Sequence, residues 1–491
     1  MRNKLLLAAL LVASAPSQAT LYPNYWTDVA RTDLDFVYRT LKDNHPGAID
    51  RQNPYFLAWM EQGYLAASAS AKQAASLSDA KRVLARYAAG FGDAHLQIQF
   101  NQSADSIQWP GLIMGRSGTR YSVTSRADNW PGPLPSLGAT LLSCDGRAPD
   151  TLMNEDVLPA LYNTPNLTAV KSMFMFHFFA DSELAPHQYR SCVFSDAAGR
   201  SEFKMTWQRI SRLAYLGRWN EANPKVSKRS SITEVAPNTW WIHLPQFQPG
   251  PDEEAELKAL IARTATLRHA TLLIFDMRGN SGGNSQWGDD VLEGLYGAPY
   301  LAYLERKQPN RAFAEYRVSR GNLDYNESGL AVLTRQFGAE SSAAKNQADL
   351  VARMRTALAA GTPFLRQTPA RPEPLRAAKA PLALTGARAV LVTDSGCVSS
   401  CLDFADAVRR LPGMRHLGQT TNADTLFMEI RQVDLPSKLG ALVLAQKVYR
   451  HRLRGHNEPL VPHLEYDGPI GDTDKLRAWV LDNASSNSRP Q

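Results

Sequence analysis

Residues 387–408, ARAVLVTDSGCVSSCLDFADAV, run from an apolar β-branched segment into a helical pattern. The spacing predicts a strand over 387–395 and a helix over about 399–411, which ends before Pro412-Gly413. Residues 270–283, ATLLIFDMRGNSGG, repeat the arrangement: a buried strand enters a glycine turn, and another helical pattern follows. Two strand-turn-helix units in one mixed sheet indicate an α/β domain.

The pattern of hydrophobic residues changes twice along the chain before this domain. The chain has 491 residues, which is long for a single hydrophobic core. Its hydrophobic content of 44% is enough to form a sizeable core. Helical spacing gives way to short β-rich runs and then to alternating strands and helices. We therefore predict a signal peptide over residues 1–19, a helical region over 20–100 and a β-rich module over 101–230. An α/β domain follows over residues 231–485, with an insertion at about 300–385.

The first residues, MRNKLLLAALLVASAPSQA, have the pattern of a secretory signal. A basic start precedes an apolar run from Leu5 to Ala13, and small residues stand at Ser17 and Ala19. An uncleaved anchor is the alternative, but a membrane span needs about 20 apolar residues, more than this run supplies. We expect a periplasmic or secreted protein without stable membrane insertion.

Charge and cysteine content narrow the possible partners. The formal net charge is +7, with no dense basic stripe or zinc-finger spacing, so we expect no nucleic acid partner. The four cysteines allow three disulfide connectivities, and proximity favours Cys397 with Cys401 and Cys144 with Cys192. A metal site is the rival interpretation, but no His or Cys stands at zinc spacing beside either pair. We expect no metal and no cofactor.

Ser399 stands where the strand of residues 387–395 gives way to a helix. Helix N-termini expose unpaired backbone N–H groups, so the N–H of Ser400 would lie near an oxyanion formed by Ser399 attack. The glycine turn at 278–283 would supply a second donor, because missing Cβ atoms allow close backbone approach. Ser399 as a simple helix cap and the glycines as an ordinary turn are the alternatives.

Several motifs together resemble the S41 peptidases, the family of tail-specific, carboxy-terminal processing and tricorn-core proteases. LLIFDMRGNSGG is followed by VLVTDSGCVSSCLDFADAV and HLGQTT, and FGDAHLQI at 91–98 is similar to a His-containing segment of tricorn-like members. GATLLSCDG resembles the family's PDZ-like module, and LVPH at 460–463 occupies the place of a C-terminal element. The resemblance implies a ClpP/crotonase-like catalytic domain with an N-terminal helical region and a PDZ-like β module.

The resemblance also assigns roles to single residues. Counting back 19 positions from Gly418 identifies Ser399 as the nucleophile, with oxyanion donors at Ser400 and at Gly282 or Gly283. Processing peptidases carry a Lys 25 residues after the Ser, but Asp424 stands there. The tricorn-like members use His, which points to His95 as general base. Glu458 is the first candidate for the carboxylate that orients His95, and Asp93 is the second. We interpret His243, His451 and His456 as structural or solvated residues.

These roles predict an exported serine endopeptidase that acts on polypeptides. The β module would bind peptide by strand addition or gate the cleft, or act as a spacer, and a Cys397–Cys401 disulfide would brace the nucleophile turn. Two other functions stay open: a catalytically inactive binding protein on the same scaffold, and an esterase or amidase that uses the same chemistry. The sequence does not determine the oligomeric state.

Overall fold

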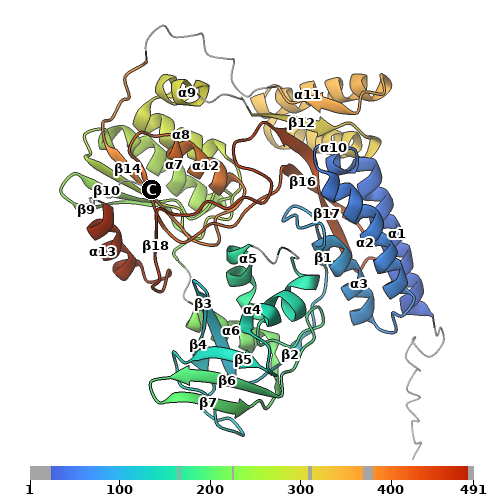
Figure 1. Ribbon diagram of the computed structural model, residues 1–491. Coiled ribbons are helices and arrows are strands. Elements are labelled where there is room, and N and C mark those ends of the chain that lie inside the picture. The colour runs from blue at the N-terminus through green and yellow to red at the C-terminus, as the bar shows by residue number, and fades with distance from the viewer. Residues whose placement is uncertain are drawn as a thin grey trace, which may run out of the picture.

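The computed structural model describes residues 24–162, 164, 167–223, 226–307, 312–368 and 380–484 (Figure 1). The predicted signal peptide, residues 1–19, lies outside the described residues. The described residues form four sheets with their helices, and the residues of the candidate site come from the ends of strands in two of these sheets.

The predicted α/β domain forms around a six-stranded sheet, in the order β18-β15-β14-β11-β10-β9. All neighbouring strands are parallel except β9 and β10. Because strand side chains alternate between faces, Leu273 and Leu391 pack toward one core, while Ile274 and Val390 pack toward the core beside the C-terminal helix. The elements are β9 (Ser231–Ala236), β10 (Thr239–His243), β11 (Leu272–Asp276), β14 (Arg388–Thr393), β15 (Arg415–Gly418), β18 (Leu464–Glu465), α7 (Pro251–Arg263), α8 (Gln286–Tyr296), α9 (Ala298–Arg306), α12 (Ser400–Arg409) and α13 (Thr473–Ala484).

The N-terminal helical region is present and packs on a second sheet (Figure 1). The order of this sheet is β1-β17-β12-β13, with β16 also paired to β17. Residues 300–385, expected as an insertion, contribute β12 and β13 to it, together with a pair of helices. The elements are α1 (Tyr25–Asn44), α2 (Pro54–Ala71), α3 (Leu77–Ala89), β1 (Gln97–Phe100), β12 (Phe313–Arg317), α10 (Arg320–Phe337), α11 (Ser342–Ala359), β13 (Phe364–Arg366), β16 (Phe427–Asp434) and β17 (Gly440–Arg450).

The β-rich residues form a five-stranded antiparallel sheet, β3-β4-β5-β6-β7, and a separate pair, β2-β8. The Cys144–Cys192 disulfide joins β5 to β6, as chain proximity favours. Short helices, which the β-rich texture did not predict, cover this sheet and complete its own core. The elements are β2 (Ser106–Trp109), β3 (Leu112–Ser117), β4 (Arg120–Arg126), β5 (Thr140–Cys144), α4 (Pro149–Leu152), α5 (Thr168–Met173), β6 (Ser191–Asp196), β7 (Gly199–Lys204), β8 (Gln208–Ser211) and α6 (Arg212–Ala222).

Strands β11 and β14 determine where the candidate site forms. They are adjacent and parallel, with Asp276 opposite Val392, so the turns that follow them meet at one edge of the sheet. The first turn is RGNSGG and the second carries Ser399. Open α/β sheets place their ligand sites at this edge, outside the carboxyl ends of the strands.

Candidate active site

Ser399 has a backbone conformation that is rare for a residue with a side chain. Its φ is 59° and its ψ is −128°, at the junction between the β14 turn and α12. Such conformations cost about 1–3 kcal/mol and persist at functional sites when the surrounding structure holds them. Although Ser399 occupies the N-cap position of α12, its side chain makes no capping hydrogen bond. The hydroxyl therefore does not perform the role of a helix cap.

The glycine turn packs directly against this serine. A Cβ added to Gly282 would lie 2.8 Å from the Ser399 Cβ and 3.2 Å from its Oγ. A Cβ on Gly283 would lie 2.1 Å from the backbone oxygen of Phe247. Both glycines also have positive φ angles, 99° and 130°, which side chains disfavour. Glycine at these positions allows the turn to approach Ser399 on one side and the Phe247 backbone on the other this closely.

Two backbone N–H groups remain available beside Ser399. Ser400 is the first residue of α12, so its N–H has no intrahelical acceptor. The Gly282 N–H donates to Oδ1 of Asn280 at 2.9 Å, whereas the Gly283 N–H has no hydrogen-bond acceptor among the residues that the structure describes. Of the two predicted glycine donors, Gly283 is the one whose N–H is free.

Asp394 connects the two turns. Its Oδ2 accepts a hydrogen bond from the Gly279 N–H at 2.9 Å, and its Oδ1 accepts one from the Gly396 N–H at 3.0 Å. Burial raises the pKa of Asp394. One carboxyl group thus fixes the start of the glycine turn relative to the turn that carries Ser399.

A buried charge pair anchors the glycine turn at the end of β11, where the turn begins. Arg278 donates to both oxygens of Asp276, at 2.8 and 2.7 Å, and to the carbonyl of Ile470 at 2.6 Å. His243 Nδ1 lies 3.1 Å from Asp276 Oδ2. Burial opposes ionisation of Asp276, but the hydrogen bonds from Arg278 and His243 hold its pKa below the usual range. His243 thus belongs to the scaffold of the turn.

His95 lies between α3 and β1 and is paired with a buried carboxylate. Asp93 Oδ1 accepts the His95 backbone N–H at 2.8 Å and lies 3.7 Å from its Nδ1. Asp93 is 1% exposed, and the His95 side chain is 14% exposed. Burial alone would lower the pKa of His95, but Asp93 and the charge of Asp424 raise it. Burial would raise the pKa of Asp93, but His95 and His45 hold it low.

The comparisons with known proteins fit this arrangement. Residues 238–466 match the model of peptidase family S41. Residues 238–466 thus belong to peptidase family S41. Mature CPAF in complex with lactacystin is similar in structure: 14% identity, TM-score 0.59, covering 93% of this chain and 99% of that chain. A CPAF mutant gives 13% identity and a TM-score of 0.62 over 95% of this chain and 100% of that chain. No curated protein sequence matched the chain.

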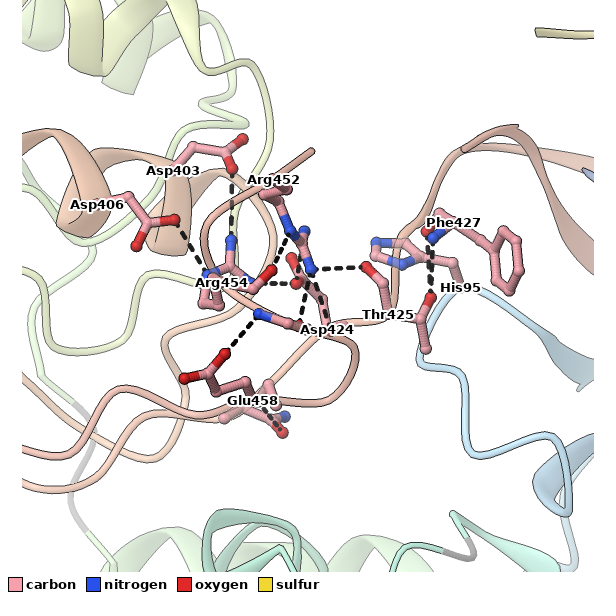
Figure 2. A network of polar contacts seen from close by, with 12 residues as sticks. His95, Asp403, Asp406, Asp424, Thr425, Phe427, Arg452, Arg454 and Glu458 are labelled. Carbon is pink, nitrogen blue, oxygen red and sulfur yellow. Dashed lines mark hydrogen bonds and ion pairs between the residues drawn. The ribbon is translucent and has the colours of Figure 1, made fainter. Parts of the chain in front are cut away.

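Membership of the S41 family makes Asp424 a notable departure, because processing peptidases have Lys there. Asp424 is fully buried, and its Oδ1 contacts Nη1 of Arg454 and, at 2.9 Å, Nη1 of Arg452 (Figure 2). Arg454 also contacts Asp406 at 3.1 Å and Asp403 at 3.5 Å, both on α12. Burial raises the pKa of Asp403 to about 6. Where the family resemblance predicts a Lys base, the structure has an ion-pair network that anchors α12, the helix that follows Ser399.

Glu458, the first candidate to orient His95, lies elsewhere. It is exposed, and its Oε2 accepts the Gly455 N–H at 2.5 Å. It lines a cavity of about 300 Å³ together with His451 and several arginines: Arg409, Arg410, Arg452 and Arg454. Figure 2 shows Asp424 and Arg452 between Glu458 and His95. The carboxylate that the structure brings to His95 is Asp93, the second candidate.

His45 is a neighbour of the site that the sequence did not reveal. It is fully buried, stacked on Phe56 with 4.3 Å between ring centroids, and its Nε2 lies 4.0 Å from Oδ2 of Asp93. Its Nδ1 accepts the Gly47 N–H at 3.0 Å, which places the ring proton on Nε2, facing Asp93. Burial lowers the pKa of His45 to about 4. No local motif marks this residue, since its role depends on a tertiary contact.

Ser399 and His95, both described, share no hydrogen bond in this structure. They come from different sheets, Ser399 from the β14 edge and His95 from the segment before β1. Catalytic hydrogen bonds are often long in ligand-free enzymes and tighten when substrate binds.

Proposed function

We propose that the chain is an exported serine endopeptidase that cleaves polypeptides through Ser399, with His95 as general base. The observation that carries the proposal is the conformation of Ser399. This strained serine does not use its hydroxyl as a cap, lies against Gly282, and has two free N–H groups beside it, those of Ser400 and Gly283. A binding protein has no need for these features at one turn.

In the proposed acylation, Ser399 Oγ forms a bond to the carbonyl carbon while His95 accepts the hydroxyl proton. The negative charge that develops on the carbonyl oxygen would be stabilised by the N–H groups of Ser400 and Gly283. Since Nδ1 of His95 faces Asp93, Nε2 is the nitrogen left to accept the proton. The C–N bond then breaks, and His95 returns the proton to the leaving amine.

In the proposed deacylation, water takes the place of the hydroxyl. His95 accepts a proton from water as the oxygen attacks the acyl carbon, and the Ser399–acyl bond breaks with return of the proton to Oγ. We assign the orienting role to Asp93, because its buried carboxylate contacts His95 and favours the imidazolium that forms in each step. Glu458 is the alternative, on a loop whose Asn457 donates to the Gly92 carbonyl at 2.7 Å.

For the β-rich module we propose a PDZ-like role in substrate binding. Strand β7 is at the edge of the five-stranded sheet and most of its residues are exposed. An exposed edge can accept an extended peptide as an added strand, with main-chain hydrogen bonds that are independent of sequence. This property suits a peptidase that acts on unfolded chains.

Two observations favour the second candidate, a catalytically inactive binding protein: Asp424 in place of Lys, and the missing Ser399–His95 hydrogen bond. Hydrolysis of an unfolded protein such as reduced casein distinguishes the peptidase from the binding protein. Wild type is compared with Ser399→Ala and with Ser395→Ala, which changes another serine of the same turn. We expect cleavage by wild type and Ser395→Ala and none by Ser399→Ala. Absence of cleavage by all three would favour the binding protein, and cleavage of esters alone would favour an esterase.

A further inference from the structure

The nucleophile turn is closed by a disulfide. Cys397 and Cys401 stand two residues before and two residues after Ser399, and both are fully buried. Their Cα atoms lie 5.4 Å apart. The bond links the end of the β14 turn to the first turn of α12, so the covalent ring contains only three intervening residues.

Hydrogen bonds hold Ser399 mainly from its C-terminal side. Its carbonyl accepts the N–H groups of Leu402 at 2.8 Å and Asp403 at 3.2 Å, which are both in α12. On the other side the Cys401 N–H donates to the Val398 carbonyl at 3.2 Å. None of these bonds involves the hydroxyl or offsets the strain of the positive φ. The disulfide closes a covalent ring around this same segment, so it restricts the backbone of Ser399 even when these hydrogen bonds open.

We propose that the Cys397–Cys401 disulfide is a positioning element for the reaction: it holds Ser399 in its reactive conformation, so that the nucleophile is formed only after oxidation. The inference rests on the proposed peptidase function and adds a condition to it. A chain with reduced cysteines would fold around a relaxed turn and would not present the Ser399 hydroxyl to substrate.

The oxidation requires a disulfide reagent as its partner. The thiolate of one cysteine attacks the disulfide of a small oxidised thiol, and the second cysteine displaces that thiol; two thiols of the chain are oxidised and one disulfide is reduced to two thiols. Because both sulfur atoms are buried in the folded protein, the exchange occurs before the turn closes. A peptidase of this kind stays inactive in a reducing compartment and becomes active in an oxidising one.

The second disulfide offers a matched control. Cys144 and Cys192 are also fully buried, but they join β5 to β6. Their sequence separation is 48 residues, compared with 4 for Cys397 and Cys401. Loop-closure entropy grows with loop length, so the long loop contributes more to global stability. The Cys144–Cys192 disulfide should therefore contribute more to global stability, and the Cys397–Cys401 disulfide more to catalysis.

The test compares Cys397→Ala/Cys401→Ala with Cys144→Ala/Cys192→Ala. The rate at which a fluorophosphonate labels Ser399 is measured with kcat and KM on an unfolded peptide and with the melting temperature. We expect labelling and kcat of the Cys397/Cys401 variant to fall about 10- to 100-fold with little change in KM, the scale expected for loss of a strained conformation. The control variant should keep kcat within about twofold and lose more in melting temperature.

Labelling of the Cys397/Cys401 variant at the wild-type rate would overturn the proposal, and so would a loss that accompanies a larger fall in melting temperature than in the control. If oxidised wild type neither labels nor cleaves, the proposed function fails by itself. Hydrogen exchange then tests the positioning alone: faster exchange of the α12 first-turn amides in the Cys397/Cys401 variant supports it, and unchanged exchange contradicts it.

Discussion

At the scale of single residues, the site depends on close approach and on one buried charge. Gly282 lets the two turns meet, and Asp93 keeps a carboxylate against His95. Both residues stand in motifs that the sequence marks. Their contacts, however, depend on how the turns fold, and this is why the sequence ranked the exposed Glu458 above Asp93.

Gly282→Ala should abolish catalysis while the fold is retained. The new methyl group would lie within van der Waals overlap of Ser399 and would need a positive φ, so the nucleophile must move. We expect kcat/KM to fall by at least about 100-fold, a typical loss when oxyanion and nucleophile geometry is disturbed. Gly217→Ala in α6, where a Cβ meets nothing within 4 Å, should leave kcat/KM unchanged.

Asp93→Asn should change the pH profile as well as the rate. The reaction needs neutral His95, and Asp93 raises the pKa of His95, so kcat/KM of wild type should fall as pH drops through a value above about 6.5. Without the carboxylate the pKa of His95 decreases, and this acid limb should move to lower pH while kcat falls about 10²- to 10⁴-fold. A pH profile of Glu458→Gln that shifts instead would assign the orienting role to Glu458.

At the scale of elements, α12 is held at its N-terminal end by the disulfide and along its middle by ion pairs. Arg454 contacts Asp403, Asp406 and Asp424, so this buried guanidinium joins the helix to the segment before β16. Arg454→Leu would leave Asp424 with Arg452 as its cationic partner among the described residues. Removing one partner of a buried network typically costs about 3–5 kcal/mol.

Urea unfolding should therefore show a free energy of unfolding lower by about 3–5 kcal/mol for Arg454→Leu. Arg409→Leu is the control, because that exposed side chain on the same helix has no ion pair among the described residues, and its effect should stay within about 0.5 kcal/mol. Equal stabilities of the two variants would contradict the assigned role of the network.

At the scale of the whole molecule, the two sheets that meet at the site differ in how well the sequence predicted them. The strand-turn-helix units at β11 and β14 follow local patterns, and their parallel pairing brings Ser399 to Gly282. The second sheet depends on pairing between β12 and β17, which are more than a hundred residues apart, and no local pattern encodes it. His45 escaped detection for the same reason.

Global stability should decrease in acid because buried histidines, among them His45 and His416, are held in neutral form. Burial lowers the pKa of His45 to about 4 and that of His416 to about 3. Both bind protons near pH 6.5 when unfolded, so the unfolded state gains protons first and stability is lost as pH falls from about 6.5 toward 4. Urea unfolding at pH 7.5, 5.5 and 4.5 should show a loss of several kcal/mol, and His45→Gln should reduce it. A free energy of unfolding independent of pH would contradict the buried neutral state.

The central claim is that Ser399 is a nucleophile activated by His95. The most direct measurement is peptide mapping by mass spectrometry after oxidised, mature protein is incubated with a fluorophosphonate, for wild type, Ser399→Ala and His95→Ala. We predict a single phosphonyl adduct on the peptide that contains Ser399, absent in Ser399→Ala and formed at least about 100-fold more slowly in His95→Ala. An adduct at another serine, or labelling of Ser399 at an equal rate without His95, would contradict the account.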